Sequence, residues 1–288
     1  MTDFTDSDVI VIGGGAAGMF SACLLAKAGK RVIIIEPNRK LGRKLRITGK
    51  GRCNLTNNSS NDNIIKNIVR NPKFMYSALS GFSSADVMDW FETRGVKLKT
   101  ERGARVFPVS DNANDIADAM EKELRRYRAV VVKDKALRIL AENGRVTGVE
   151  CADRDYYAEN VILSTGGSSY PATGSTGDGY SMAKKLGHTV TEISASLVPI
   201  VCEERFVAYL SGLALKNVTL SLYDIRKKKP VYSELGELSF MPYGIAGPLS
   251  LTASCYMNRE KLEAGEYRIA IDLKPGLTEE QLERRIQR

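Results

Sequence analysis

Residues 9–36 carry the pattern that most constrains the fold of this chain. The apolar segments 9–12 and 31–35 predict two buried strands, and residues 16–28 between them predict a helix. Strands that are apolar on both faces are typical of parallel sheets covered on both sides, and a strand, a helix and a second strand in close succession form a βαβ unit. We therefore expect an α/β fold with a doubly covered parallel sheet.

The turn between the first strand and the helix, GGGAAG, has the spacing of a dinucleotide-binding fingerprint. Gly13 permits the sharp turn, Gly15 lets the backbone approach a pyrophosphate, and Gly18 lets the helix pack closely on the strand. Ala16 and Ala17 open the helix, whose N-terminus attracts phosphate charge. A glycine-rich turn without a ligand is the weaker alternative, because the motif lies in register with its strands and helix.

Glu36 ends the second strand, 18 residues after Gly18. A carboxylate at this point can accept hydrogen bonds from a ribose 2′-hydroxyl. A nucleotide with a free 2′-hydroxyl is therefore favoured over one with a 2′-phosphate, although Arg39 and Arg43 nearby weaken that inference. The fingerprint leaves the choice between NAD and FAD open.

The basic, glycine-interrupted stretch 42–56 follows Glu36 closely, so we expect it to run along the nucleotide. Three of its side chains can neutralise a pyrophosphate: Arg43, Lys44 and Arg52. Three of its backbone N–H groups can line a flat ring system: those of Thr48, Gly49 and Gly51. The alternative is a solvated basic loop.

A third segment brings bare backbone to the same edge of the sheet. The predicted strand 161–164 opens into Thr165, Gly166 and Gly167, and ligands bind at the carboxyl ends of strands in open α/β sheets. Asp178 begins the next helix, where it is either a ligand contact or an N-cap.

Further elements follow from periodicity and turn chemistry. A helix capped by Ser83 or Ser84 is expected to end at Gly95, and a second helix follows residues 111–112. A β-meander is predicted at 129–133, 136–141 and 145–149, with the last two strands joined by the turn pair Asn143-Gly144.

The pattern changes near residue 195. We expect a dinucleotide-binding domain over 1–194 and a mostly β domain over 195–288, with strands at 197–202, 218–223, 237–240 and 267–273. Thr278 and Gln281 form a possible capping box for a final helix.

Composition excludes several classes of protein. Five scattered cysteines without a CxxC pair and a single histidine, His188, argue against a disulfide framework, a metal site and a histidine triad. No apolar run reaches the length of a membrane span, and residues 1–8 do not resemble a secretory signal, so a cytoplasmic protein without a membrane partner is expected. The net charge of +8 suits anionic partners, but nucleic acid is disfavoured because three basic runs lack interleaved aromatic residues. The runs are 39–52, 125–128 and 226–229.

Taken together, the motifs GGGAAG, GRKLRITGKGRCNLTN, ERGARVFPVS and STGGSSYPATGSTGDGY resemble a bacterial family of NAD(P)/FAD-dependent oxidoreductases. These are aminoacetone-oxidase-like FAD-binding flavoproteins that include dehydro-bile-acid reductases. The resemblance extends through GELSFMPYGIAGP and IDLKPGLTEEQLERR, and so covers essentially the whole chain.

The resemblance implies a glutathione-reductase-like FAD domain with an inserted, barrel-like β domain. It also implies FAD contacts from the fingerprint residues Gly13, Gly15, Ala16, Ala17, Gly18 and Glu36, and from Arg43, Lys44, Thr48, Gly49, Gly51, Arg52, Cys53, Asn54, Thr165, Gly166, Gly167 and Asp178. Ala136 in the meander is expected to meet adenine through its backbone. The implied reaction takes hydride from NAD(P)H and passes it to a small organic acceptor, such as an activated C=C bond, with anionic substrates favoured by the basic loop.

The chain departs from the family pattern at two points. Similar proteins continue further, close the barrel and return to the FAD domain, so we expect the second domain to be incomplete here. Met241-Pro242 also stands where relatives often carry Thr-His, which leaves no assigned proton donor. The alternative hypothesis is a non-catalytic or truncated protein that binds nucleotide or nucleic acid; the catalytic residues and the oligomeric state stay open.

Overall fold

The computed structural model describes residues 7–287. They belong to two compact units, which meet in sequence between Thr191 and Glu192. Within the described residues, no helix combines the length and the hydropathy needed to cross a bilayer. The expectation that the N-terminus is not a signal sequence falls largely on residues 1–6, which lie outside the described part.

The first unit is built on a four-stranded parallel sheet with the order β10-β1-β2-β6. The register sets Ile12 of β1 beside Leu163 of β10 and Ile35 of β2, so these three strands end at the same level. The strands are β1 (Val9–Ile12), β2 (Val32–Ile35), β6 (Val130–Val132) and β10 (Val161–Leu163). The chain moves from β1 towards β2 and returns on the other side of β1, which makes the point between β1 and β10 a topological switch point.

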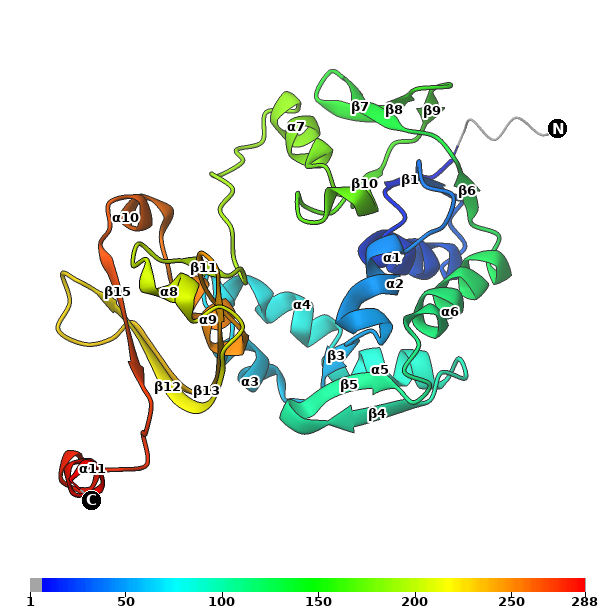
Figure 1. Ribbon diagram of the computed structural model, residues 1–288. Coiled ribbons are helices and arrows are strands. Elements are labelled where there is room, and N and C mark those ends of the chain that lie inside the picture. The colour runs from blue at the N-terminus through cyan, green and yellow to red at the C-terminus, as the bar shows by residue number, and fades with distance from the viewer. Residues whose placement is uncertain (1–6, 288) are drawn as a thin grey trace. The chain divides into compact units, whose positions relative to one another are not determined.

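Each face of this sheet is covered by a different layer (Figure 1). Val9, Val11 and Ile34 pack on one side against α1 (Ala16–Lys27), α5 (Ser84–Glu92) and α6 (Ala113–Arg126). Ile10 and Ile33 pack on the other side against the β-meander, whose strands are β7 (Ala136–Glu142), β8 (Arg145–Cys151) and β9 (Tyr156–Tyr157). The segment 129–133 was wrongly predicted as a meander strand, because it pairs with β2 as β6 of the parallel sheet. The continuous apolar runs predicted this double cover, and the α/β fold class is confirmed.

Local signals placed several elements correctly. Ser83 caps α5 with a capping box shared with Asp86, and Asn112 caps α6. Asn143 and Gly144 both have positive φ, at 49° and 76°, as a tight hairpin turn between β7 and β8 requires.

The remaining elements of the first unit are short. A three-stranded antiparallel sheet has the order β3-β5-β4, and the sequence analysis did not predict it. Its strands are β3 (Thr56–Asn57), β4 (Leu98–Glu101) and β5 (Arg105–Pro108). The short helices are α2 (Arg43–Ile47), η1 (Thr48–Gly51), α3 (Asn61–Lys66), η2 (Pro72–Met75), α4 (Tyr76–Gly81), η3 (Arg102–Ala104), η4 (Pro171–Thr173) and α7 (Asp178–Lys185).

The second unit is a five-stranded antiparallel sheet with the order β11-β14-β13-β12-β15. Leu220, Leu222 and Leu238 form the centre of its own core, on which α9 packs. Its strands are β11 (Ile200–Val201), β12 (Ala214–Asp224), β13 (Tyr232–Met241), β14 (Gly244–Ala246) and β15 (Tyr267–Asp272), and its helices are α8 (Phe206–Tyr209), α9 (Pro248–Ser254), α10 (Arg259–Glu263) and α11 (Glu279–Ile286). Thr278 and Gln281 form the expected capping box of α11.

Two expectations for this unit were wrong in detail. The strand expected at 197–202 shrinks to β11, because Leu197 has a φ of 56° and Pro199 has no N–H to donate to a ladder. The change of pattern near residue 195 also predicted an end to the alternation of helices, but α8, α9 and α10 interrupt the strands. Each of these three helices has seven or fewer residues, too short a stretch for helical periodicity to be visible.

Candidate functional site

A groove of about 800 Å³ lies at the carboxyl edge of the parallel sheet. Three chain segments far apart in sequence form its walls. These are the turn after β1, the stretch from Glu36 through α2, and the loop from the end of β10 into α7. The groove therefore occupies the edge where open α/β sheets bind their ligands.

Three glycines of the GGGAAG motif, Gly13, Gly15 and Gly18, differ in what a side chain would meet at each position. Gly13 has a φ of 103°, and a Cβ there would lie 2.6 Å from the carbonyl oxygen of Ser164. At Gly18 a Cβ would lie 1.9 Å from the carbonyl oxygen of Gly13, so only glycine lets α1 pack this closely on the turn. Gly15 is different, because no protein atom lies within 4 Å of a Cβ built there. Its bare backbone faces open space in the groove wall.

The N-terminus of α1 is free to bind an anion. Its N-cap is Gly15, no side chain caps the helix, and its first turn contains no acidic residue. The first N–H groups of a helix have no partner within the helix, and the helix dipole adds positive potential at the same place. Gly15, Ala16 and Ala17 all line the groove, so this anion site opens into it.

Glu36 is buried at the end of β2 and held by a hydrogen-bond network. Its Oε2 accepts from the Gly14 backbone N–H at 2.8 Å, and its Oε1 accepts from the Asn38 backbone N–H at 2.9 Å and from Asn38 Nδ2 at 2.6 Å. A carboxylate has about four acceptor positions, so this network leaves room for a further donor such as a ribose hydroxyl. The network fixes the carboxylate before any ligand arrives.

Lys44 joins two walls of the groove. Its Nζ donates to the Ser169 carbonyl oxygen at 2.7 Å and to Ser175 Oγ at 2.8 Å, both in the loop that follows β10. Arg43, the next residue back, is exposed and donates to Asn38 Oδ1 at 2.6 Å. Two cations thus stand on the rim of the groove beside the anion site of α1.

Arg46 fixes the helix that carries these cations. Its guanidinium donates to Asn114 Oδ1 at 2.8 Å, to Asp118 Oδ1 at 2.8 Å and to Glu121 Oε1 at 2.6 Å. All three partners belong to α6, and the Arg46 side chain is only 12% exposed. Arg46 therefore clamps α2 onto α6, and sequence inspection did not reveal this role.

Arg52 does not line the groove. Its guanidinium lies over the Phe107 ring, 4.2 Å from the centroid, and pairs with Glu101 at 2.5 Å and with Asp111 at 2.6 Å. The Arg52 guanidinium lowers the pKa of the Glu101 carboxyl by hydrogen bonding, and Lys99 and Arg52 together lower that of Asp111. Arg52, which was expected to neutralise a pyrophosphate, is instead paired with the carboxylates of Glu101 and Asp111.

Cys53 is fully buried and packs in the core beside α1 and α6. Burial raises the pKa of its thiol to about 11, so the side chain is a thiol and not a reactive thiolate at neutral pH. Its φ of 59° places it in the left-handed region together with Gly49 and Lys50. This environment fits a packing role for Cys53 better than a redox role.

The structure brings most of the expected contact residues to one groove. Those that line it are Gly13, Gly15, Ala16, Ala17, Glu36, Arg43, Lys44, Thr48, Asn54, Thr165 and Gly166. Those that do not are Gly18, Gly49, Gly51, Arg52, Cys53, Ala136, Gly167 and Asp178. Asp178 is the first residue of α7, whose N-cap is Gly177, and its carboxylate lies 4.0 Å from Lys135 Nζ.

Three further groove residues, which the sequence analysis did not assign, hold the charged side chains in place. Gly14 and Asn38 donate to Glu36, and Ser175 accepts from Lys44. The second glycine of GGGAAG was the available signal for Gly14. Asn38 and Ser175 had none, because their roles depend on loops meeting in space.

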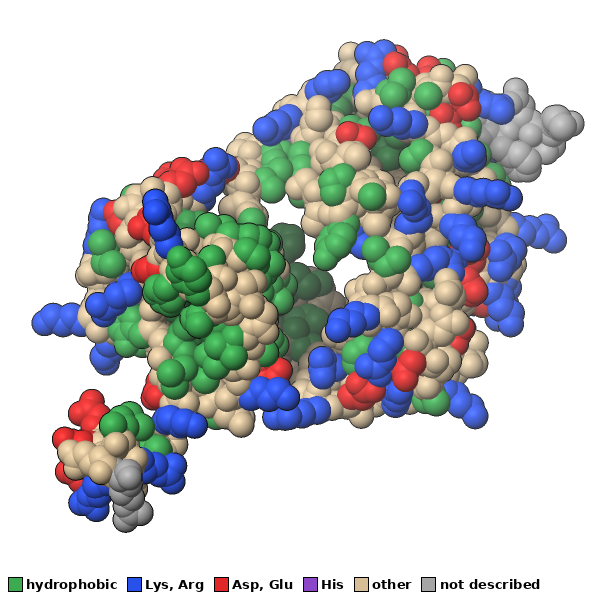
Figure 2. Space-filling model, in the orientation of Figure 1, with side chains coloured by type: hydrophobic (Ala, Val, Ile, Leu, Met, Phe, Trp, Pro, Cys, Tyr) green, Lys and Arg blue, Asp and Glu red, His purple; other side chains and the backbone are tan. Residues whose placement is uncertain are grey.

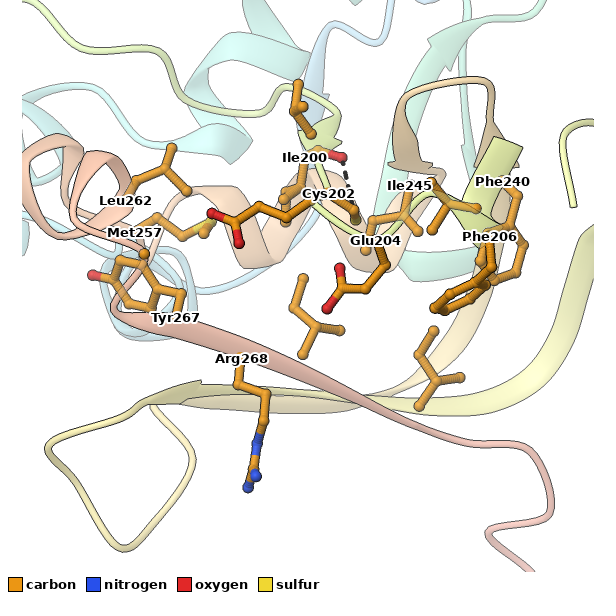
Figure 3. Close-up of a pocket in the computed structure, with 16 residues that line it drawn as sticks. Ile200, Cys202, Glu204, Phe206, Phe240, Ile245, Met257, Leu262, Tyr267 and Arg268 are labelled. Atoms are coloured by element: carbon orange, nitrogen blue, oxygen red, sulfur yellow. Dashed lines mark hydrogen bonds between the residues drawn. The ribbon is translucent and has the colours of Figure 1, made fainter. Parts of the chain in front are cut away.

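A second cavity, of about 230 Å³, lies inside the second unit (Figure 3). Its lining comes from β11, α8, β14, β15 and neighbouring segments, and includes Ile200, Phe206 and Ile245. Figure 3 shows the Arg268 side chain directed away from the cavity. Among the described residues, the groove of the first unit combines an uncapped helix N-terminus, a buried carboxylate and two cations, which are features of a nucleotide site.

Comparison with known proteins supports this description. The family model described as "HI0933-like protein Rossmann domain" matches residues 7–247. The open conformation of a flavocytochrome c3 fumarate reductase is similar in fold, with a TM-score of 0.55 and 21% identity, covering 74% of this chain and 47% of that one.

Two curated relatives align with most of the chain. A 3-dehydro-bile acid delta(4,6)-reductase of Clostridium scindens is 27% identical over 274 residues, which are 94% of this chain and 66% of the relative. A ribosomal RNA dihydrouridine synthase of Escherichia coli is 31% identical over 279 residues, 94% of this chain and 64% of the relative. The chain thus spans about two thirds of the length of these relatives.

Proposed function

Because the chain belongs to the HI0933-like Rossmann family of FAD-binding oxidoreductases, we propose that it binds FAD in the groove of its first unit and reduces a C=C bond conjugated to a carbonyl group. The observation that carries the proposal is the uncapped N-terminus of α1, which opens into the same groove as the pre-oriented Glu36 carboxylate. The helix N-terminus suits a pyrophosphate, and the carboxylate suits the hydroxyl groups of an adenosine ribose.

The residues of the groove fit FAD group by group. The N–H groups of Ala16 and Ala17 would meet the pyrophosphate, and Gly15 would let it approach the backbone. Glu36 would accept from the free ribose 2′-hydroxyl of FAD and repel a 2′-phosphate. Lys44 would hold the loop after β10 against the ligand, and Arg43 would add positive charge at the rim.

Four more of the expected contacts remain in the proposal, and two others are given a different role. Thr48, Asn54, Thr165 and Gly166 line the groove and remain proposed contacts. Gly18 acts by close packing, and Arg52 acts by fixing the stretch that carries Thr48 and Asn54. The other expected contacts lie outside the lining and have no role in the proposal: Gly49, Gly51, Cys53, Ala136, Gly167 and Asp178.

FAD, when bound, accepts a hydride and passes it on, and we propose NADH or NADPH as the donor. The support for an activated C=C acceptor is that both relatives are named for such chemistry. A delta(4,6)-reductase of a 3-dehydro bile acid acts on double bonds conjugated to a ketone, and dihydrouridine is uridine with its C5–C6 bond saturated.

The acceptor itself has two candidates. The first is a small conjugated carbonyl compound, as the bile acid relative suggests. The second is a uracil in RNA, which the 31% identity to the ribosomal RNA dihydrouridine synthase and the net charge of +8 favour. Figure 2 shows lysine and arginine side chains spread over the visible face, with acidic side chains among them.

An anaerobic titration tests the proposal. The chain is loaded with FAD, and the flavin absorbance near about 450 nm is followed while NADH or NADPH is added. We expect bleaching by at least one nucleotide, and recovery when a conjugated enone or a uridine-containing RNA is added. Bound FAD that neither nucleotide bleaches would refute the proposed donor, and bleached flavin that neither acceptor restores would refute the proposed acceptor class.

A further inference from the structure

Residues 66–76 run from the last residue of α3 through η2 to the first residue of α4. They expose aromatic and basic side chains together, and we name them the aromatic–basic segment. Phe74 is 85% exposed and Tyr76 is 51% exposed. Lys66 and Lys73 are exposed beside them. A phenylalanine this exposed buries almost none of its apolar surface, so the core does not explain its presence.

The charge of this region is of one sign. From residue 63 to residue 85 the sequence contains Lys66, Arg70 and Lys73 and no acidic residue. The nearest carboxylates along the chain are Asp62 and Asp86, and Asp86 is occupied in the capping box of Ser83. Along the chain, the aromatic residues are therefore flanked by basic and not by acidic residues.

The segment is held by its flanking elements. Asn61 Nδ2 donates to the Leu79 carbonyl oxygen at 2.8 Å and ties the start of α3 to α4, while Ile65 is buried (Figure 1). Asn71, with a φ of 52°, and Pro72 open the helical turn η2. The rings are thus displayed on a fixed turn, which lowers the entropy lost when a ligand stacks on them.

The segment and the groove belong to the same unit. Asn54 lines the groove, and Lys66, the first residue of the segment, follows it by twelve residues.

We propose that the aromatic–basic segment is a binding surface for single-stranded RNA, on which unpaired bases stack on Phe74 and Tyr76 while Lys66 and Lys73 pair with phosphates. Exposed aromatic side chains interleaved with cations are the usual means of binding single strands. The identification of RNA as the ligand rests on the RNA form of the proposed function, and the position of the surface rests on the segment itself. The proposal departs from the expectation, drawn from the sequence, that nucleic acid is disfavoured as a partner.

Fluorescence anisotropy with a labelled single-stranded oligouridylate of about 10 nucleotides tests the proposal. We expect the wild-type chain to bind in a salt-dependent manner, and Phe74→Ala and Tyr76→Ala each to lose about 5- to 150-fold in affinity. Lys73→Gln should lower the slope of log affinity against log salt by about 0.7. Tyr209→Ala is the matched control, because Tyr209 is 89% exposed but has no role in the segment, and should bind as the wild type does.

Conservative variants separate base stacking from general apolar contact. Phe74→Trp should keep the affinity and Phe74→Leu should lose it, because only an aromatic ring stacks on a base. If Leu serves as well as Phe, the surface is an apolar contact for a protein partner and the proposal is overturned. Absence of binding by the wild type, or equal binding by both alanine variants, overturns it too. Because the assay measures RNA affinity without flavin reduction, its failure is distinct from a failure of the proposed FAD chemistry.

Discussion

Glu36 is the residue on which the proposed choice of nucleotide depends. Its two oxygens are held by Gly14 and Asn38, so the carboxylate cannot turn away from a ligand without breaking three hydrogen bonds. Such preorganisation makes its charge effective, because no binding energy is spent on orienting it. A fixed negative charge accepts from a hydroxyl and opposes a phosphate.

Exchanging Glu36 for Gln tests this selectivity. The wild-type chain should bind ADP at least about tenfold more tightly than ADP with a 2′-phosphate, because like charges face each other in the second case. Glu36→Gln should lower the ratio of these two affinities, each measured by competition with FAD. Glu159→Gln removes the same charge at an exposed position outside the groove and should leave the ratio unchanged. A ratio that is equal in wild type and Glu36→Gln contradicts the role given to Glu36.

Cysteine reactivity gives a second test at the residue scale. Burial raises the pKa of Cys53 to about 11 and that of Cys23 to about 12, so at pH 8 both are thiols shielded from solvent. Iodoacetamide, which reacts with thiolates, should modify the half-buried Cys255 well before either of them. Mass spectrometry of the native protein measures this order. The pKa shifts predict that any labelling of Cys53 increases as pH rises towards 11; rapid labelling at pH 8 would show that it is exposed.

At the scale of elements, α2 depends on a clamp that is remote in sequence. Arg46 joins α2 to three side chains of α6, more than sixty residues away. Arg46→Met keeps the aliphatic stem but removes these charged hydrogen bonds, and should lower the free energy of unfolding by about 1–3 kcal/mol. Urea unfolding followed by circular dichroism measures the change.

The same variant should also weaken FAD binding, because α2 carries Arg43 and Lys44 to the rim of the groove. Arg125→Met is the control, since Arg125 pairs with Glu121 only at 3.4 Å and is 70% exposed. It should change neither quantity appreciably. If Arg46→Met leaves both stability and FAD affinity at wild-type values, α2 is not positioned by this clamp.

Elements with a strong local signal were predictable from the sequence. β1, α1 and β2 have continuous apolar runs around a glycine turn, and α6 has a cap and an amphipathic period. α2 was not predicted, because its basic residues form a helix only when α6 supplies carboxylates. The sheet β3-β5-β4 was missed because its strands have only two to four residues, too few for a strand pattern to be visible.

At the scale of the whole molecule, all the residues that line the groove belong to the first unit. The three walls of the groove come from residues 13–17, 36–54 and 162–183, which the parallel strands bring to one edge. The sequence analysis identified contact residues in each wall, because each wall follows a strand of the parallel sheet. It could not assign Arg52, whose partners Glu101 and Asp111 lie 49 and 59 residues away, or recognise that Phe74 is exposed.

The most direct test of the account is the FAD affinity of Gly15→Val beside that of the wild type. A Cβ at Gly15 meets no protein atom within 4 Å and the residue has a φ of −78°, so the fold tolerates the side chain while the side chain fills the proposed place of the pyrophosphate. Gly276→Val, which also meets no atom, is the control. The account predicts that Gly15→Val loses at least about 100-fold in FAD affinity, with an unchanged circular dichroism spectrum, and that the control binds as the wild type. Equal FAD affinity in Gly15→Val and the wild type would contradict binding in this groove.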